Sequence, residues 1–241
     1  MSLVEILRVL YDDIIRHDPL APDDPARDRC ILSKGHGCLA LYAILVDKGY
    51  FPAEELDRFC RVDGILGGHP EYGKVPGVEA STGALGHGLS IGVGMALAAR
   101  MQGRASRVFV VMGDGEINEG SVWEAALCAG KHRLSNLCAI VDYNKIQSAG
   151  FTAEIQDLEP LLDKWQSFGF AVADVDGHDV SALNSTFARL PLEADRPTAI
   201  VCHTVKGKGI PFAENDPKWH HHSRFDPQVL DDIYQAIGGR A

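Results

Sequence analysis

The chain has 241 residues, of which 46% are hydrophobic and 23% are charged, and its formal net charge is −10 at pH 7. A chain of this length and composition can bury a full core, so we expect one large globular domain and exclude a disordered or fibrous protein. The net negative charge argues against a protein that binds nucleic acid, because such proteins need a basic surface.

The sequence shows neither a membrane-spanning segment nor a signal peptide. Its apolar runs are interrupted well before the roughly 20 residues that a membrane span requires. The N-terminal sequence MSLVEILRVLYDD lacks a basic region and a cleavage site. The six cysteines form no C-x-x-C pair, and most lie in apolar runs such as LCAIVD, which predicts buried thiols. We therefore expect a cytoplasmic protein.

Strand-like and helix-like segments alternate along the chain. Sequences typical of strands cover residues 29–32, 107–112, 137–142, 170–175 and 198–203. Sequences typical of helices cover residues 39–48, 86–101, 119–134, 158–168 and 180–190. This alternation predicts an α/β fold with a mostly parallel sheet, helices on both faces and right-handed crossovers.

Two long segments rich in Pro and Gly interrupt this alternation. Residues 66–88 read LGGHPEYGKVPGVEASTGALGHG, and residues 206–227 follow the last predicted strand. Both are much longer than the two to six residues of an ordinary connection. Long ordered loops usually carry function, so we expect the two segments to line one cleft.

A carboxylate and an amide follow two successive predicted strands. Asp114 comes directly after the strand at 107–112, and Asn144, thirty positions later, follows the strand at 137–142. Because ligands bind at the carboxyl edge of an open α/β sheet, we expect both side chains to reach one site. Their oxygens, with a backbone carbonyl near Ile146 and two diphosphate oxygens, would suit a magnesium ion.

Two glycines flank the carboxylate. Gly113 and Gly115 allow the backbone to approach a phosphate closely, and the predicted helix that follows adds its N-terminal dipole. Taken alone, the sequence G-D-G is only a turn signal. The matching position of Asn144 at the next strand end favours a phosphate and metal site.

These residues belong to a pattern that resembles transketolases. The sequence GDGEINEGSVWEAALCAGKHRLSNL followed by VDYNKIQ is similar to the thiamine diphosphate motif of that family. Further similar blocks occur in the family's order: ILSKGHGCLALYAILVDKGYF, LGGHPE, PGVEASTGALGHGLSIGVGMALA, VDGHD and HTVKGKGIPFAEN. The resemblance covers nearly the whole chain. It implies that residues 1–241 form a single diphosphate-binding domain of the thiamine diphosphate-binding fold.

The resemblance also implies a cofactor and a metal. Asp114, Asn144 and the carbonyl of Ile146 would hold Mg²⁺, or Ca²⁺ or Mn²⁺ in its place. The other residues implied in binding thiamine diphosphate are Lys34, His36, Gly83, Leu85, Gly113, Gly115, Glu116, Lys206 and His220.

Four residues match catalytic positions of the family. His36 and His220 correspond to residues beside the cofactor phosphates and the reacting centre, and His69 of GHPE corresponds to a residue that contacts the donor's first hydroxyl groups. Glu119 forms, with Glu124, a pair that links two cofactor sites through a dimer interface. Five residues apart on a helix, these glutamates point about 140° from each other, so one can face the cofactor and the other the interface.

Several neighbouring residues have simpler interpretations. Trp123 is expected to pack in the core because of its large apolar area. His221 and His222 have no counterpart in the family and are interpreted as bystanders. His87 stands where many full-length members have Gln, and the sequence assigns it no consequence.

Two segments of full-length transketolases have no counterpart in the sequence. One is a Gly-His-Pro-Gly segment that precedes the match to SLVEILRVLYDD. The other comprises the pyrimidine-binding and C-terminal domains, which would follow Ala241. We therefore expect these domains to reside on a second polypeptide, which supplies the glutamate that activates the cofactor. Two copies of each chain would form a heterotetramer.

The expected activity is transfer of a two-carbon ketol unit from a ketose or ketose phosphate to an aldose, by one subunit of a heteromeric glycolaldehydetransferase. Alternatives are a thiamine enzyme of the deoxyxylulose-phosphate synthase type, a transketolase for an unusual sugar, and a non-catalytic cofactor-binding subunit. The run EGSVWEA favours a transketolase. A dinucleotide-binding protein is discounted because no G-x-G-x-x-G follows a strand.

Overall fold

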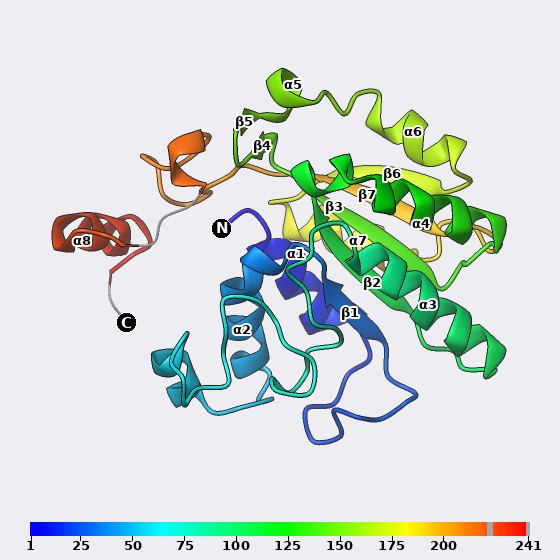
Figure 1. The fold of residues 1–241 in the computed structure, drawn as a ribbon, viewed down its shortest axis with the longest axis horizontal. Helices are drawn as coiled ribbons and strands as arrows, with labels where there is room; N and C mark the ends of the chain where they lie inside the picture. The colour runs from blue at the N-terminus through cyan, green and yellow to red at the C-terminus, as the bar shows by residue number, and fades with distance from the viewer. Residues whose placement is uncertain (221–223, 240–241) are drawn as a thin grey trace.

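A five-stranded parallel sheet forms the centre of the protein (Figure 1). The structure is a computed structural model that describes residues 1–220 and 224–239. In the sheet the strands lie in the order β1-β2-β3-β7-β6. Their bounds are Arg29–Leu32 for β1, Val108–Gly113 for β2, Leu137–Tyr143 for β3, Ala171–Asp176 for β6 and Thr198–His203 for β7.

Helices cover both faces of this sheet (Figure 1). One face packs against α1 (Val4–Val9), α2 (Cys38–Asp47) and α7 (Val180–Phe187). The opposite face packs against α3 (Gly88–Met101), α4 (Gly120–Lys131) and α6 (Leu161–Ser167). The sequence-based prediction of a parallel sheet between two helical layers is therefore confirmed.

The alternation of side chains along each strand explains the two layers. On β2, Phe109 and Val111 belong to the core beside α1 and α2, whereas Val108 and Val110 belong to the core beside α3 and α4. Every residue of β2 and β3 is buried. Strands buried on both faces have no polar side, which is why these segments read as nearly continuous apolar runs.

The predicted bounds of the strands agree closely with the structure, whereas those of the helices differ from α2, α3, α4, α6 and α7 by up to three residues at one end. The strands predicted at 29–32 and 198–203 match β1 and β7, and the other three differ by about one residue at each end. The alternation does not predict α1 with its following π-helical turn, the hairpin of β4 and β5, or the helices α5 and α8. The turn covers Leu10–Ile14, β4 covers Ile146–Gln147 and β5 covers Gly150–Phe151. Helix α5 covers Thr152–Ile155, and α8 covers Pro227–Ala236.

The cysteines lie largely where the sequence predicts. Four of the six (Cys30, Cys38, Cys138 and Cys202) are buried, Cys128 is partly buried and Cys60 is exposed, and all six are free thiols. Burial raises the pKa of Cys30 to about 12, so its thiol stays protonated at neutral pH. No helix within residues 1–220 and 224–239 is long and apolar enough to cross a membrane.

Two glycines of α3 provide a matched test of this packing. A Cβ atom added at Gly92 would lie 2.6 Å from Cγ2 of Val110, whereas one added at Gly94 would have no atom within 4 Å. We predict that Gly92→Ala destabilises the chain by about 1–3 kcal/mol through overpacking. Gly94→Ala should stabilise it by up to about 1 kcal/mol through helix propensity. Urea unfolding followed by circular dichroism checks both values, and equal midpoints for the two variants would show that the α3–β2 packing is wrong.

Candidate functional site

The loops that follow four strands meet at the carboxyl edge of the sheet. Lys34 and His36 follow β1. Gly113 is the last residue of β2, and residues 114–116 follow it. Asn144 follows β3, and Lys206 follows β7. Together they line one cavity, whose lining residues are Lys34, His36, Leu85, Gly113, Asp114, Gly115, Glu116, Asn144, Ile146, Gln147, Ser148, Lys206 and His220.

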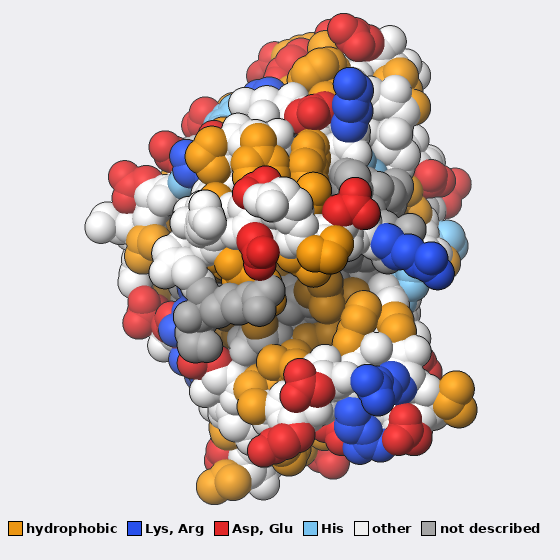
Figure 2. All heavy atoms as spheres, turned by 90° about the vertical axis from the view of Figure 1, so that its left-hand side faces the viewer, with side chains coloured by type: hydrophobic (Ala, Val, Ile, Leu, Met, Phe, Trp, Pro, Cys, Tyr) orange, Lys and Arg blue, Asp and Glu red, His pale blue; other side chains and the backbone are white. Residues whose placement is uncertain are grey.

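This cavity gathers eleven of the twelve residues that the sequence predicts for the cofactor. Gly83, the twelfth, lies outside the lining and packs against the ring of His69. Gln147 and Ser148 line the cavity but were not predicted, although they directly follow VDYNKI in the sequence. The side of the molecule at the left of Figure 1 is hollowed, with hydrophobic side chains around the hollow and basic and histidine side chains at one edge (Figure 2).

Asp114 lines the cavity and is almost fully buried. Its Oδ1 accepts a hydrogen bond from the backbone N–H of Gly115 at 2.7 Å, and its Oδ2 accepts one from that of Lys145. Burial raises the pKa of Asp114 to about 6, and the charge of Lys34 opposes this rise. The carboxylate is thus desolvated, which increases its attraction to a cation.

Asn144 and Ile146 complete a set of oxygen donors beside Asp114. The pairing of Gly113 with Asp142 places the ends of β2 and β3 side by side, and both Asn144 and Ile146 are buried. Asn144 Oδ1 accepts a hydrogen bond from the N–H of Ile146 at 3.2 Å. A carboxylate, an amide oxygen and a backbone carbonyl fit a hard cation such as Mg²⁺, which would take its remaining oxygens from a phosphate and water.

Two lysines supply positive charge to the cavity. Lys34 is buried, and its Nζ donates a hydrogen bond to Asp142 Oδ2 at 2.7 Å. Burial lowers the pKa of Lys34, but the ion pair with Asp142 outweighs this effect and raises the pKa overall. Within residues 1–220 and 224–239, Lys206 forms no ion pair with a carboxylate. Burial and then the charge of Lys34 lower its pKa to about 8, although Asp114 and Asp142 oppose this effect. An anion bound here would relieve the repulsion between the two lysines.

Asp142 forms a buried ion pair with Lys34 and so fixes the position of that side chain. Its side chain is fully buried and accepts three side-chain hydrogen bonds, from Ser2 Oγ at 2.7 Å, from Lys34 Nζ and from Thr204 Oγ1. Burial raises its pKa, yet the charge of Lys34 and these hydrogen bonds outweigh burial and lower it to about 2. Asp142 therefore stays charged and holds the N-terminal segment and the loops after β1 and β7 together.

Glu116 contributes to the shape of the cavity in a similar way. Its carboxylate accepts hydrogen bonds from Ser33 Oγ, from the N–H of Gly86 at 3.1 Å and from the N–H of Gly113 at 3.0 Å. Burial raises its pKa. These contacts connect the ends of β1 and β2 to the start of α3. Although Glu116 lines the cavity, its carboxylate therefore stabilises the loops around it.

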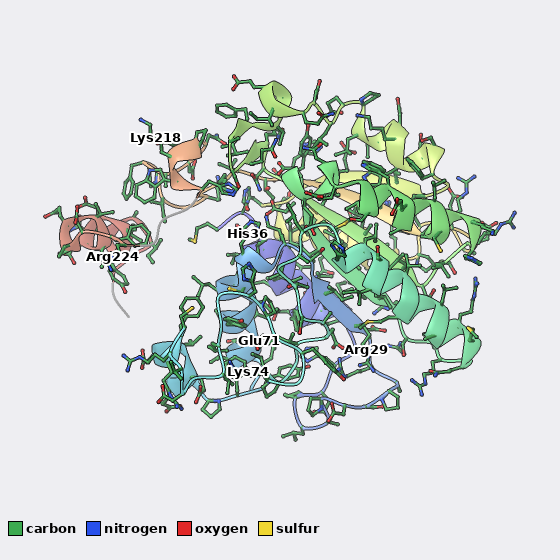
Figure 3. The ribbon with its side chains drawn as sticks, viewed as in Figure 1. Arg29, His36, Glu71, Lys74, Lys218 and Arg224 are labelled. Carbon is green, nitrogen blue, oxygen red and sulfur yellow. The ribbon has the colours of Figure 1, made fainter. Side chains whose placement is uncertain are left out.

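Three predicted catalytic histidines lie in or near the cavity. The rings of His36 and His220 are 5.8 Å apart, and His220 also contacts Lys206 Nζ at 2.6 Å and Ser148 Oγ at 3.3 Å. Figure 3 shows His36 beyond the carboxyl end of β1, far from Arg29 at the other end of that strand. The other two histidines of the triplet, His221 and His222, lie outside the described residues.

His69 lies exposed at the edge of this group. A Cβ atom on Gly35 would lie 2.9 Å from Cδ2 of His69, and one on Gly83 would lie 3.2 Å from the same atom. The hydroxyl oxygen of Tyr42 lies 3.0 Å from the carbonyl oxygens of both Gly67 and His69, and these two acceptors share its one hydrogen. The absence of side chains on the two glycines therefore lets the ring of His69 pack directly on the loop that carries His36.

Glu119 does not line the cavity. It is exposed at the start of α4 beside Gly86, and Glu124 is exposed one turn further along. Trp123 is partly buried and packs against Trp165 and Phe168 with ring centroids 5.1 and 5.3 Å apart, which confirms the prediction that it is a packing residue.

Comparisons with known proteins agree with this geometry. Residues 1–235 match the family model "Transketolase, thiamine diphosphate binding domain". One of the subunits of the apulose-4-phosphate transketolase of Phocaeicola vulgatus is 43% identical over 221 residues, which are 92% of this chain and 78% of that protein. The 6-deoxy-6-sulfo-D-fructose transketolase subunit SqwG of Clostridium sp. is 44% identical over 92% of this chain and 80% of that protein.

The solved structures show the same fold. The transketolase of Pichia stipitis in complex with sedoheptulose 7-phosphate superposes with a TM-score of 0.91 at 31% identity. The match covers 98% of this chain and 36% of the Pichia stipitis chain, so the chain spans about a third of that longer protein.

Asp114 provides the most direct test of the metal set. We predict that Asp114→Ala weakens Mg²⁺-dependent binding of thiamine diphosphate by more than the roughly 10- to 100-fold that loss of an outer-shell partner costs, because it removes a charged ligand. Asp195→Ala is the matched control, since Asp195 is exposed just before the amino end of β7. Calorimetry measures the affinity, and thermal unfolding verifies that each variant is folded. An unchanged affinity in Asp114→Ala would refute the metal assignment.

Proposed function

This chain belongs to the transketolase family, and on that premise we propose that it is the diphosphate-binding subunit of a two-polypeptide transketolase. The enzyme would transfer a two-carbon ketol unit from a ketose to an aldose. The observation that carries the proposal is the single cavity that combines a buried oxygen donor set with Lys34 and Lys206 at one sheet edge. We further propose that residues 1–241 act as a single domain.

The charged groups that line the cavity suit the diphosphate of thiamine diphosphate together with a divalent metal. When bound, this cofactor supplies the carbanion chemistry that breaks and forms a carbon–carbon bond next to a carbonyl. We propose that Asp114, Asn144 and the carbonyl of Ile146 hold Mg²⁺, which would neutralise part of the diphosphate. Lys34 and Lys206 would neutralise more of it. Gly113 and Gly115, which carry no side chain, would let the backbone approach the diphosphate closely, and Leu85 would contact the cofactor with its apolar side chain.

The histidines would act on the substrate oxygens. His36 and His220 face each other in the cavity, and His69 lies at its edge, so a ketose entering from this side would meet all three. Histidine can donate or accept a proton near neutral pH. We propose that these residues orient the donor hydroxyl groups and move protons to and from the substrate oxygens during ketol transfer.

A second polypeptide would complete the site. The two relatives described above are named as subunits, and this chain covers 78% and 80% of their lengths. Leu85, Met101 and Leu127, which lie around α3 and α4, are 38%, 84% and 60% exposed, and we propose that the partner covers them. We propose that the partner supplies the pyrimidine-binding half. Two copies of each chain would form a cytoplasmic heterotetramer, with Glu119 and Glu124 at the interface.

The names of the relatives suggest a class of donor. One relative is named for a ketose phosphate and the other for a sulfonated ketose. Both sugars carry a strongly acidic group, so we propose that the donor here is also an anionic ketose.

His69 tests the proposed contact with the donor. We predict that His69→Ala lowers turnover by about 10²- to 10⁴-fold, the range for loss of a positioned acid–base group. The affinity for thiamine diphosphate should stay nearly unchanged, because His69 lies outside the cavity lining. His132→Ala, at the far end of α4, is the control. A variant that loses cofactor binding but turns over normally once loaded would reverse the assignment.

The isolated chain tests the need for a partner. We predict that the purified chain, given Mg²⁺ and thiamine diphosphate, shows no ketol transfer from a ketose donor. The cofactor needs a carboxylic acid against its pyrimidine ring, and the acidic residues of this cavity already serve the metal set and the loops. Co-expression with a polypeptide resembling the pyrimidine-binding half should restore transfer. Full activity of the chain alone would overturn the two-polypeptide proposal.

A further inference from the structure

The loop that carries Lys206 is fastened by two side chains from outside the cavity. Thr204 Oγ1 donates a hydrogen bond to Asp142 Oδ1, and the N–H of Val205 donates one to His178 Nε2 at 2.8 Å. The next residue is Lys206, whose Nζ lies 2.6 Å from Nδ1 of His220. The orientation of the Lys206 side chain therefore depends on a backbone that His178 holds in place.

His178 is itself fixed by its surroundings. Because Nε2 accepts a hydrogen bond from a backbone N–H, the neutral ring carries its proton on Nδ1. Nδ1 lies 3.1 Å from Oε1 of Glu5, an α1 residue, in an ion-pair contact whose geometry is not that of a hydrogen bond. The side chains of His178 and Glu5 are 12% and 27% exposed. The negative charge of Glu5 beside Nδ1 favours a proton on that nitrogen, and this is the tautomer in which Nε2 can accept from Val205.

The backbone around His178 is equally constrained. Its N–H donates a hydrogen bond to Asp176 Oδ1 at 2.9 Å, and the N–H of Gly177 donates one to the carbonyl of His203 at 2.8 Å. A Cβ atom on Gly177 would lie 2.3 Å from Cγ2 of Thr204. The turn VDGHD therefore packs directly on the start of the Lys206 loop, and a larger residue at position 177 would push the two apart.

We propose that His178, oriented by Glu5, is a positioning residue that fixes the backbone at Val205 and so places Lys206 against the cofactor's diphosphate. This inference rests on the proposed function, because it assigns the anion that Lys206 meets. None of the residues of the VDGHD motif lines the cavity. The inference gives this motif an indirect role, through His178 and the backbone at Val205.

Two substitutions of His178 distinguish the role of Nε2 from that of Nδ1. In His178→Gln the amide oxygen can reach the place of Nε2 and still accept from Val205. In His178→Asn the shorter amide reaches only the place of Nδ1, so the bond to Val205 is lost while a donor toward Glu5 remains. We expect His178→Asn to weaken binding of thiamine diphosphate with Mg²⁺ by about 10- to 100-fold, as for loss of an outer-shell partner. His178→Gln should stay within about threefold of the unsubstituted protein.

A double-mutant cycle with Lys206→Ala identifies the route of the effect. If His178 acts through Lys206, His178→Asn should cause little further loss in the Lys206→Ala protein, because coupled residues are not additive. Calorimetry on the assembled complex measures cofactor affinity, and thermal unfolding without cofactor measures stability separately. Equal losses in the Gln and Asn variants, or fully additive losses with Lys206→Ala, would overturn the inference. Failure of the unsubstituted complex to bind the cofactor would instead overturn the proposed function on which the inference rests.

Discussion

The buried ion pair between Asp142 and Lys34 is the contact on which the arrangement of the site depends. Removing either partner would leave a desolvated charge without compensation, which typically costs several kcal/mol. Because Asp142 also accepts hydrogen bonds from Ser2 and Thr204, it connects the N-terminal segment with the loops after β1 and β7. The same pair keeps Lys34 charged where it lines the cavity. The surplus positive charge of Lys206 then favours an anion, whose binding would raise the lowered pKa of that amine.

Much of the fold follows from the hydrophobic pattern alone. The strands are buried on both faces, so they appear as apolar runs bounded by turn residues, and their bounds could be predicted within about one residue. The pattern missed α1 because that helix has only six residues, too few for a clear helical period. It also missed α8, although Val229, Leu230 and Ile233 recur at helical spacing; these residues are only partly buried.

The site was predictable to the extent that its chemistry lies at strand ends. The spacing of Asp114 and Asn144 indicated that they meet, and the pairing of β2 with β3 explains why they do. The supporting contacts could not be predicted in the same way. Asp142 reads as a polar residue in an apolar strand, and only the structure shows that Ser2, 140 positions away, donates to it. His178 likewise becomes informative only when its distance to the N–H of Val205 is known. Contacts between distant segments leave no periodic signal in the sequence.

The central claim is that one sheet edge holds thiamine diphosphate through a metal bound by Asp114, Asn144 and the carbonyl of Ile146. Crystals of the assembled complex grown with thiamine diphosphate and Mn²⁺ would test it through the anomalous scattering of the manganese. We expect one strong anomalous peak per copy of this chain, about 2.0–2.3 Å from these three oxygens and from two diphosphate oxygens. A peak elsewhere, or a cofactor bound at another edge of the sheet without metal, would contradict the account.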